Sequence, residues 1–321
     1  MPMRSGTAIL AVLAILLPLP FVVHSDFWMN LAILSLYYGF LGQAWNLLGG
    51  YGGQFSFGHA AFFGTGAYAT AVMQVRLGLN PWLGFVLAAM LAGAVGAFIG
   101  GLSFRYRLRG SYFALVTLAF AEVFRILANT FEITGAGTGL LVPLKQTPAN
   151  FQFAQKSGFY LVIWALTACG FAVAWWIEHS RFGARLVAVR ENEDAARALG
   201  VDALRVKLAA ITLSAALTGL AGAFYVQYFL YIDPTIAYGP SVSVTALLVP
   251  IVGGLGNALG PLLGAVALQL LDQVARAAMG DAPGLNLVLY GVVLVAMLMF
   301  LPNGLFGIAR SSALRLFRVA A

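Results

Sequence analysis

The chain has 321 residues, of which 61% are apolar or aromatic and only 9% are charged. Soluble domains carry about 25% charged residues, so this composition excludes an ordinary cytosolic enzyme and a disordered chain. A single cysteine excludes an intrachain disulfide scaffold, and basic loops beside a membrane account for the formal net charge of +7 without a nucleic-acid partner. The composition indicates an integral membrane protein.

Apolar segments long enough to cross a bilayer recur along the chain, since a spanning helix needs about 20 residues. We predict about ten transmembrane segments, near residues 8–24, 28–48, 54–75, 82–104, 111–130, 158–178, 208–232, 241–255, 258–273 and 285–302. The segments 241–255 and 258–273 are short and interrupted by glycine, so they form either two crossings or one broken, re-entrant pair.

The predicted fold is an all-α polytopic membrane protein with one transmembrane domain over residues 1–321. Its helical bundle comprises 8–130 and 158–305, with hydrophilic loops at 131–157 and 179–207. The apolar run after Arg4 has the start of a signal peptide but no small-residue cleavage site, so we predict a retained first helix.

The basic residues predict the orientation of the bundle. Most of the 18 Lys and Arg residues fall on one side when the N-terminus is placed in the cytoplasm. By the positive-inside rule, both termini and the 179–207 loop are then cytoplasmic, and the 131–157 loop is periplasmic.

Glycine-rich stretches predict two breaks in the helices. Gly49-Gly50-Tyr51-Gly52 and Gly253-Gly254-Leu255-Gly256 each lie between an inward and an outward segment. Transporters often place such broken helices on the substrate path, although two unrelated turns would give the same pattern.

Glu122 and Arg125 lie inside a predicted span, where an unpaired charge costs about 2.5–3.5 kcal/mol on insertion scales. Their three-residue spacing lets them pair on one helix face. We favour a structural ion pair between packed helices over a polar point on a transport path or at a partner subunit.

The 179–207 loop predicts a short helix. Asn192 can cap it, Glu193 and Asp194 suit its first turn, and Gly200 can end it in the left-handed conformation. Such a helix could dock in a groove on a soluble partner or lie on anionic membrane lipid. The residue pattern alone does not separate these two roles.

Several chemistries have no motif in this sequence. No Gly-Lys-Ser or Gly-Lys-Thr occurs, so the chain lacks a phosphate-binding P-loop. The histidines have no metal-ligand spacing and no catalytic set converges, so we predict no metal site and no enzyme activity.

The segment from Asp194 to Gly200, DAARALG, resembles the EAA–x3–G coupling motif of ABC importer permeases, with Asp in place of Glu. The stretches GYGGQFSFGHA at 50–60, TLAFAE at 117–122, VRENEDAA at 189–196 and GGLGN at 253–257 are similar to branched-chain amino acid permeases of the LivM type. The resemblance covers about 28–305. Departures at Ala136 and Asn257 bear on the cargo rather than on the family.

This resemblance implies a type II ABC importer-like bundle that forms half of a pore in a bacterial inner membrane. It implies a second homologous permease, two ABC ATPase subunits that use the ATP, and a periplasmic substrate-binding protein. No cofactor is expected on this chain. The expected coupling residues are Glu193, Asp194, Ala195, Ala196 and Gly200. The expected pore-side residues are Gly50, Gly52, Gly53, Gln54, Ser56, Gly58, His59, Gly253, Gly254, Gly256 and Asn257.

The expected cargo is Leu, Ile or Val. The same machinery carrying urea, short amides or other amino acids is the alternative. An ion-coupled secondary transporter that acts without ATPases is a less favoured one.

Overall fold

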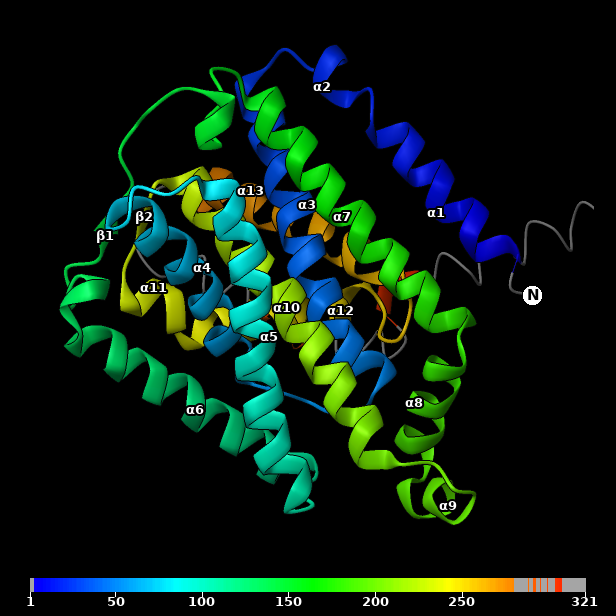
Figure 1. The fold of residues 1–321 in the computed structure, drawn as a ribbon. Helices are drawn as coiled ribbons and strands as arrows, with labels where there is room; N and C mark the ends of the chain where they lie inside the picture. The colour runs from blue at the N-terminus through cyan, green and yellow to red at the C-terminus, as the bar shows by residue number, and fades with distance from the viewer. Residues whose placement is uncertain are drawn as a thin grey trace, which may run out of the picture.

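The computed structural model describes residues 3–279, the isolated positions 288, 291, 292, 295 and 299, and residues 304–307. The described chain is a helical bundle (Figure 1). Its α-helices are α1 (Met3–Leu16), α2 (Leu19–Val22), α3 (Asp26–Asn46), α4 (His59–Val75), α5 (Pro81–Arg105), α6 (Gly110–Thr130), α7 (Lys156–His179), α8 (Arg181–Glu191), α9 (Glu193–Ala198), α10 (Ala203–Phe229), α11 (Pro234–Tyr238), α12 (Pro240–Gly253) and α13 (Gly260–Met279).

Shorter elements connect these helices. They are the π-helical turn η1 (Leu47–Tyr51), the 3₁₀ turns η2 (Glu132–Thr134) and η3 (Pro148–Asn150), and the antiparallel strands β1 (Leu140–Leu141) and β2 (Tyr231–Ile232). The strand pair ties the 131–157 loop to the chain that follows α10.

Five described helical segments are long and apolar enough to cross a membrane, in agreement with the predicted all-α polytopic fold. They are Asp26–Tyr51, Pro81–Arg105, Gly110–Thr130, Lys156–His179 and Ala203–Phe229. The predicted span 285–302 falls largely outside the described residues.

Two predicted spans differ in the structure. The segment 8–24 is two helices rather than one, because Pro18 and Pro20 interrupt the helix after Leu16. The segment 54–75 becomes helical only at His59, and residues 53–58 are non-helical. Hydropathy measures how apolar a residue is and not how its backbone is hydrogen-bonded. The apolar Phe55 and Phe57 therefore led to the wrong prediction of a helix in this segment.

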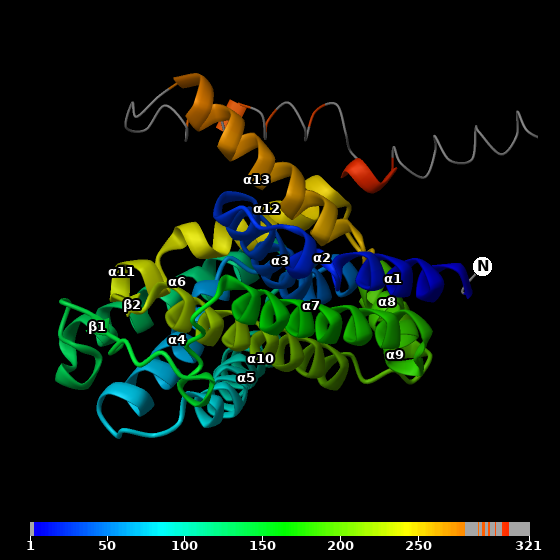
Figure 2. The same ribbon diagram turned by 90° about the horizontal axis from the view of Figure 1, so that it is seen from above.

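The pair formed by α12 and α13 resembles the broken alternative more than two full crossings. At about 1.5 Å of rise per residue, the 14 residues of α12 extend roughly 21 Å, less than the ~30 Å hydrocarbon core. The two helices pack closely, since a Cβ atom added at Gly253 would lie 1.8 Å from the Gly260 carbonyl oxygen. Figure 2 shows α12 and α13 on the side of the bundle away from α5.

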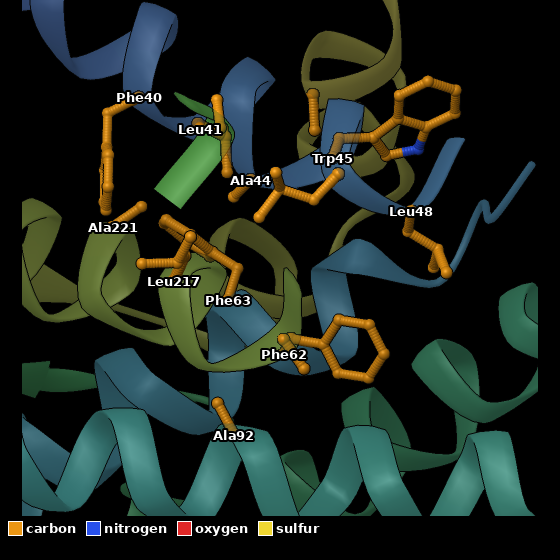
Figure 3. Close-up of a cluster of buried hydrophobic side chains, with 14 of the residues drawn as sticks. Phe40, Leu41, Ala44, Trp45, Leu48, Phe62, Phe63, Ala92, Leu217 and Ala221 are labelled. Atoms are coloured by element: carbon orange, nitrogen blue, oxygen red, sulfur yellow. The ribbon is translucent and has the colours of Figure 1, made fainter. Parts of the chain in front are cut away.

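The core of the bundle is built around α10, with α3, α4 and α5 packed against it. Figure 3 shows Phe40 and Leu41 of α3, Phe63 of α4, and Leu217 and Ala221 of α10 converging there, each at most 5% exposed. Lipid tails are as apolar as these side chains, so close packing rather than water exclusion holds the helices together.

Glycine permits the closest contacts of α10. A Cβ atom at Gly66 would lie 2.2 Å from the Gly219 carbonyl oxygen, and one at Gly219 would lie 2.5 Å from the Ala92 Cβ. The backbones of α4, α5 and α10 therefore meet at a spacing that no larger residue allows.

We expect Gly219→Ala to lower the melting temperature of the purified chain, because overpacking a close contact costs about 1–3 kcal/mol. Gly101→Ala is the matched control, since a Cβ atom there meets nothing within 4 Å. A better helix former at that site should leave stability unchanged or raise it. Equal melting temperatures for Gly219→Ala and the unmodified chain would contradict this account of the core.

Candidate coupling and pore site

Helices α8 and α9 form a lobe at one end of the bundle, between α7 and α10 (Figure 1). The side chain of Asn192 caps α9 by accepting hydrogen bonds from the backbone N–H groups of Asp194 and Ala195, at 3.1 and 3.0 Å. Gly200 follows with φ of +86°. Asp202 then caps α10 by accepting from the N–H of Arg205. The predicted cap at Asn192 and left-handed stop at Gly200 are confirmed.

The expected coupling residues divide between two faces of α9. Asp194, Ala195 and Gly200 are exposed, whereas the Glu193 and Ala196 residues are only 8% and 3% exposed. The buried pair can hold α9 on the bundle, and only the exposed residues can contact a partner. Leu199 is also exposed, at 86%, although it was not among the expected coupling residues. Its position four residues after Ala195 places it on the same helix face, and this spacing could have identified it from the sequence.

The carboxylate of Glu193 holds α9 to two other parts of the chain. Lys207 of α10 donates to both of its oxygens at 3.1 Å, and Arg109, just before α6, lies 3.2 Å away. Arg197 of α9 itself donates at 2.7 Å. The side chain of Lys207 is 1% exposed and its Nζ lies 4.8 Å from the centre of the Phe104 ring. A charge this deeply buried needs its partner.

Arg109 also reaches the exposed carboxylate beside Glu193. Its Nη2 donates to Asp194 Oδ1 at 3.3 Å. This hydrogen bond and the charge of Glu193 raise the pKa of Arg109, so the guanidinium stays charged. Ion pairs therefore hold the α5–α6 turn, α9 and the start of α10 together.

The first predicted break interrupts the helix between η1 and α4. The chain turns at Gly53, with φ of +65°, and returns to a helix at His59. Trp45 Nε1 donates to the Ser56 carbonyl at 2.8 Å, and His59 Nε2 lies 2.9 Å from Ser214 Oγ. Ser214 donates in turn to the Ala44 carbonyl. Protein groups thus satisfy the Ser56 carbonyl within the break and contact the Ala44 carbonyl before it, as a bilayer requires of a broken helix.

Asn46 joins this break to the second one by contacting Asn257, which lies 211 positions later in the sequence. Its Nδ2 donates to the Asn257 carbonyl at 3.0 Å, and its Oδ1 accepts from the Gly256 N–H at 2.9 Å. A Cβ atom at Gly50 would lie 2.6 Å from that same nitrogen, so the two glycine-rich turns touch.

Arg190 of α8 connects the lobe to both turns. Its Nη1 donates to the Gly50 carbonyl at 3.0 Å, and its aliphatic stem packs against Gly53. Glu191 Oε1 accepts from its Nε and Nη2 at 3.0 and 2.6 Å. The contacts run without interruption from α8 through Gly50 to Gly256. The sequence indicated each part but not that they meet, because no local pattern reports a contact over such a separation.

The remaining pore-side residues lie at close approaches. A Cβ atom at Gly58 would lie 2.3 Å from the Thr117 carbonyl oxygen, and the Phe57 N–H donates to Thr117 Oγ1. Gly52 lies over the Leu48 carbonyl, Gln54 donates to the Gly52 carbonyl, and Gly254 ends α12 with φ of +128°. Within the described residues, no group of His, Cys, Asp and Glu could hold a metal ion.

Glu122 and Arg125 pair with each other on α6, at 2.8 and 2.5 Å. Their side chains are 47% and 32% exposed, so the pair is not enclosed between helices of the described chain. The neighbouring Val123 and Ile126 are also exposed, at 49% and 53%. The pair therefore lies on an outward, apolar face of α6.

We expect Glu193→Gln to destabilise the chain by about 3–5 kcal/mol, because Lys207 would stay buried without a counter-charge. Asp194→Asn changes the adjacent exposed acid and should stay within about 0.5 kcal/mol. Thermal unfolding in detergent measures both. Adding Lys207→Met to Glu193→Gln should restore much of the loss, and an unrestored double variant would show that the ion pair is not the cause.

The comparisons agree with the motif resemblance. The family described as "Branched-chain amino acid transport system / permease component" matches residues 27–298. The high-affinity branched-chain amino acid transport system permease protein LivM of Escherichia coli strain K12 is 31% identical over 94% of this chain and 75% of its own length. The corresponding LivH protein of the same strain is 24% identical over 87% of this chain and 94% of its own.

A third relative comes from Methanocaldococcus jannaschii. Its probable branched-chain amino acid transport permease protein LivM is 27% identical over 78% of this chain and 77% of its own length. With a family match across most of its length and these relatives, the chain belongs to the branched-chain amino acid transport permease family, as a multi-pass membrane protein.

Proposed function

We propose that this chain is one permease subunit of an ATP-driven importer for branched-chain amino acids and forms half of its pore. The relatives are permeases of branched-chain amino acid transport. The observation that carries the proposal is the contact path from α8 through Arg190 to Gly50 and Gly256. This path links α8, which leads directly into the exposed helix α9, to both helix breaks.

The orientation proposed from the basic residues has support in the fold. A Cβ atom at Gly6 would lie 3.0 Å from Trp175, near the end of α7 that leads into α8. Gly304 lies beside Gly254, at the turn that contacts Gly50. Gly6 and Gly304 therefore lie toward the end of the bundle that carries the α8–α9 lobe, and we assign this end to the cytoplasm of a bacterial inner membrane.

ATP hydrolysis is assigned to partner subunits. The sequence has no P-loop, and α9 with its C-cap residue Leu199 exposes Asp194, Ala195 and Leu199 on one face. Two ABC ATPases would bind this face in the two halves of the transporter. LivM and LivH are separate permeases in the same bacterium, which supports a second permease partner. A periplasmic binding protein would deliver the amino acid.

In this mechanism, the ATPases move α9, and Glu193 carries the start of α10 and the α5–α6 turn with it. Arg190 transmits the movement of α8 to the carbonyl of Gly50. Asn46 couples that turn to the turn at Gly256 and Asn257. The two breaks then shift together and change which side of the pore is open.

We expect Arg190→Gln to lower ATP-driven uptake by roughly ten- to a hundredfold, since a charge-assisted hydrogen bond is worth about 1.5–3 kcal/mol and each 1.36 kcal/mol is about tenfold in rate. Arg185→Gln removes an exposed cation from the same helix and should leave uptake unchanged. ATPase subunits should co-purify equally with both variants. Full uptake by Arg190→Gln would exclude the proposed transmission path.

The function itself is tested by uptake into vesicles that contain the complete transporter. Leucine should accumulate only when ATP and the ATPase subunits are present. Accumulation by this permease alone under an ion gradient would identify a secondary transporter. ATP-driven import of urea or short amides without leucine would keep the ABC machinery and overturn the cargo.

A further inference from the structure

A cavity of about 290 Å³ lies between α3, α4, α10, α11 and the start of α12. Its apolar lining includes Leu41 of α3 and Phe63 of α4. Its polar lining consists of hydroxyl groups and contains no charged side chain. The hydroxyl-bearing residues are Tyr37, Tyr38, Tyr225, Ser241 and Thr245.

None of these five hydroxyls forms a hydrogen bond within the part of the chain that the structure describes. Hydroxyls elsewhere in these long helices bond to the backbone, as Thr218 does to the Ser214 carbonyl at 2.8 Å and Thr212 to the Leu208 carbonyl at 2.8 Å. Tyr37 is only 3% exposed, and its hydroxyl still has no hydrogen-bond partner among the described residues. Buried polar groups are normally paired, so hydroxyls open to one cavity indicate a polar occupant.

The cavity offers different surroundings to positive and negative charge. Helix α12 begins at Pro240, no side chain caps it, and Ser241 and Val242 of its first turn line the cavity. Pro240 has no N–H and the Val242 N–H donates to the Gly239 carbonyl at 3.2 Å, so Ser241 is the cavity-lining residue of this turn that keeps a free N–H. A free N–H at the positive end of a helix dipole favours a carboxylate. The rings of Tyr37 and Tyr225, with centres 6.2 Å apart, favour an ammonium group.

We propose that this cavity is a transient site for one zwitterionic amino acid with a small aliphatic side chain. The carboxylate lies at the start of α12 beside Ser241, the ammonium group faces the tyrosines, and the side chain contacts Leu41 and Phe63. The volume is at the lower end of ligand pockets, which limits the site to one small molecule. This inference rests on the proposed function and adds a place for its cargo.

The uncharged lining keeps binding weak. Conduction needs a site that the solute enters readily and also leaves readily. Hydroxyls and ring faces meet both demands, whereas a buried Arg or Asp would hold the zwitterion by a full charge. We therefore expect rapid exchange of the bound amino acid.

The test is saturation-transfer difference NMR of leucine methyl protons with the full chain in nanodiscs of phosphatidylethanolamine and phosphatidylglycerol. Tyr225→Phe with Thr245→Val removes two open hydroxyls, and Val242→Trp fills the cavity. Thr212→Val is the matched control, because Thr212 bonds to its own helix and does not line the cavity.

We expect the leucine signal to fall at least threefold in the double variant, to vanish in Val242→Trp and to stay unchanged in Thr212→Val. The double variant keeps the test decisive where Val242→Trp fails to fold. Absence of a leucine signal from the unmodified chain, equal signals from all variants, or an equal signal from urea would each overturn the site.

Uptake by the complete transporter separates this failure from failure of the proposed function. If the cavity variants import leucine at the unmodified rate and show the unmodified signal, the site is wrong and the importer stands. If the unmodified transporter does not import leucine, the proposed function is wrong.

Discussion

A helix that breaks inside a bilayer loses backbone hydrogen bonds that lipid cannot replace. The breaks after Tyr51 and Gly253 can therefore exist only where side chains of the same bundle reach them. Asn46 supplies an acceptor and a donor to the second turn, and Arg190 supplies a donor to the first. The proposed contact path from α8 to the two breaks depends on that requirement, because the groups that satisfy the breaks also connect them to α8.

Glycine makes this arrangement geometrically possible. Gly50 and Gly256 bring two backbones together, and Gly53 turns the chain with a positive φ that other residues rarely adopt. Gly260 and Gly264 lie four residues apart, a spacing that places two small residues on one helix face and lets another helix approach closely. In the structure, α13 uses Gly260 and Gly264 against the end of α12, which carries the second break. The same glycine contacts therefore pack α13 against α12 and hold the end of α12 at the second break.

Local features of the fold were predictable from sequence, and distant contacts were not. The cap at Asn192, the stop at Gly200 and the pairing of Glu122 with Arg125 each depend on neighbours within a turn or two of helix. The contact of Asn46 with Asn257 depends on how whole helices pack. Hydropathy also wrongly predicted a helix at residues 53–58, because a non-helical segment and a helix can have the same composition.

The acids of α9 show why a motif alone does not assign roles. The resemblance aligns Asp194 with the acid of the coupling motif, and both acids suit the first turn of a helix equally. Burial distinguishes them, since Glu193 faces Lys207 and Asp194 faces outward. The ion pairs of Glu193 with Lys207 and Arg109 are strong because Glu193 and Lys207 are buried and charged. Helix α9 therefore cannot move without α10 and the α5–α6 turn. In the proposed mechanism, the buried ion pairs of Glu193 transmit movement at this end, and neutral hydroxyls line the cavity proposed to bind and release the solute. A permease that held its cargo with buried charges like those around Glu193 would release it slowly, so the proposed mechanism assigns strict selection of the cargo to the binding protein rather than to the pore.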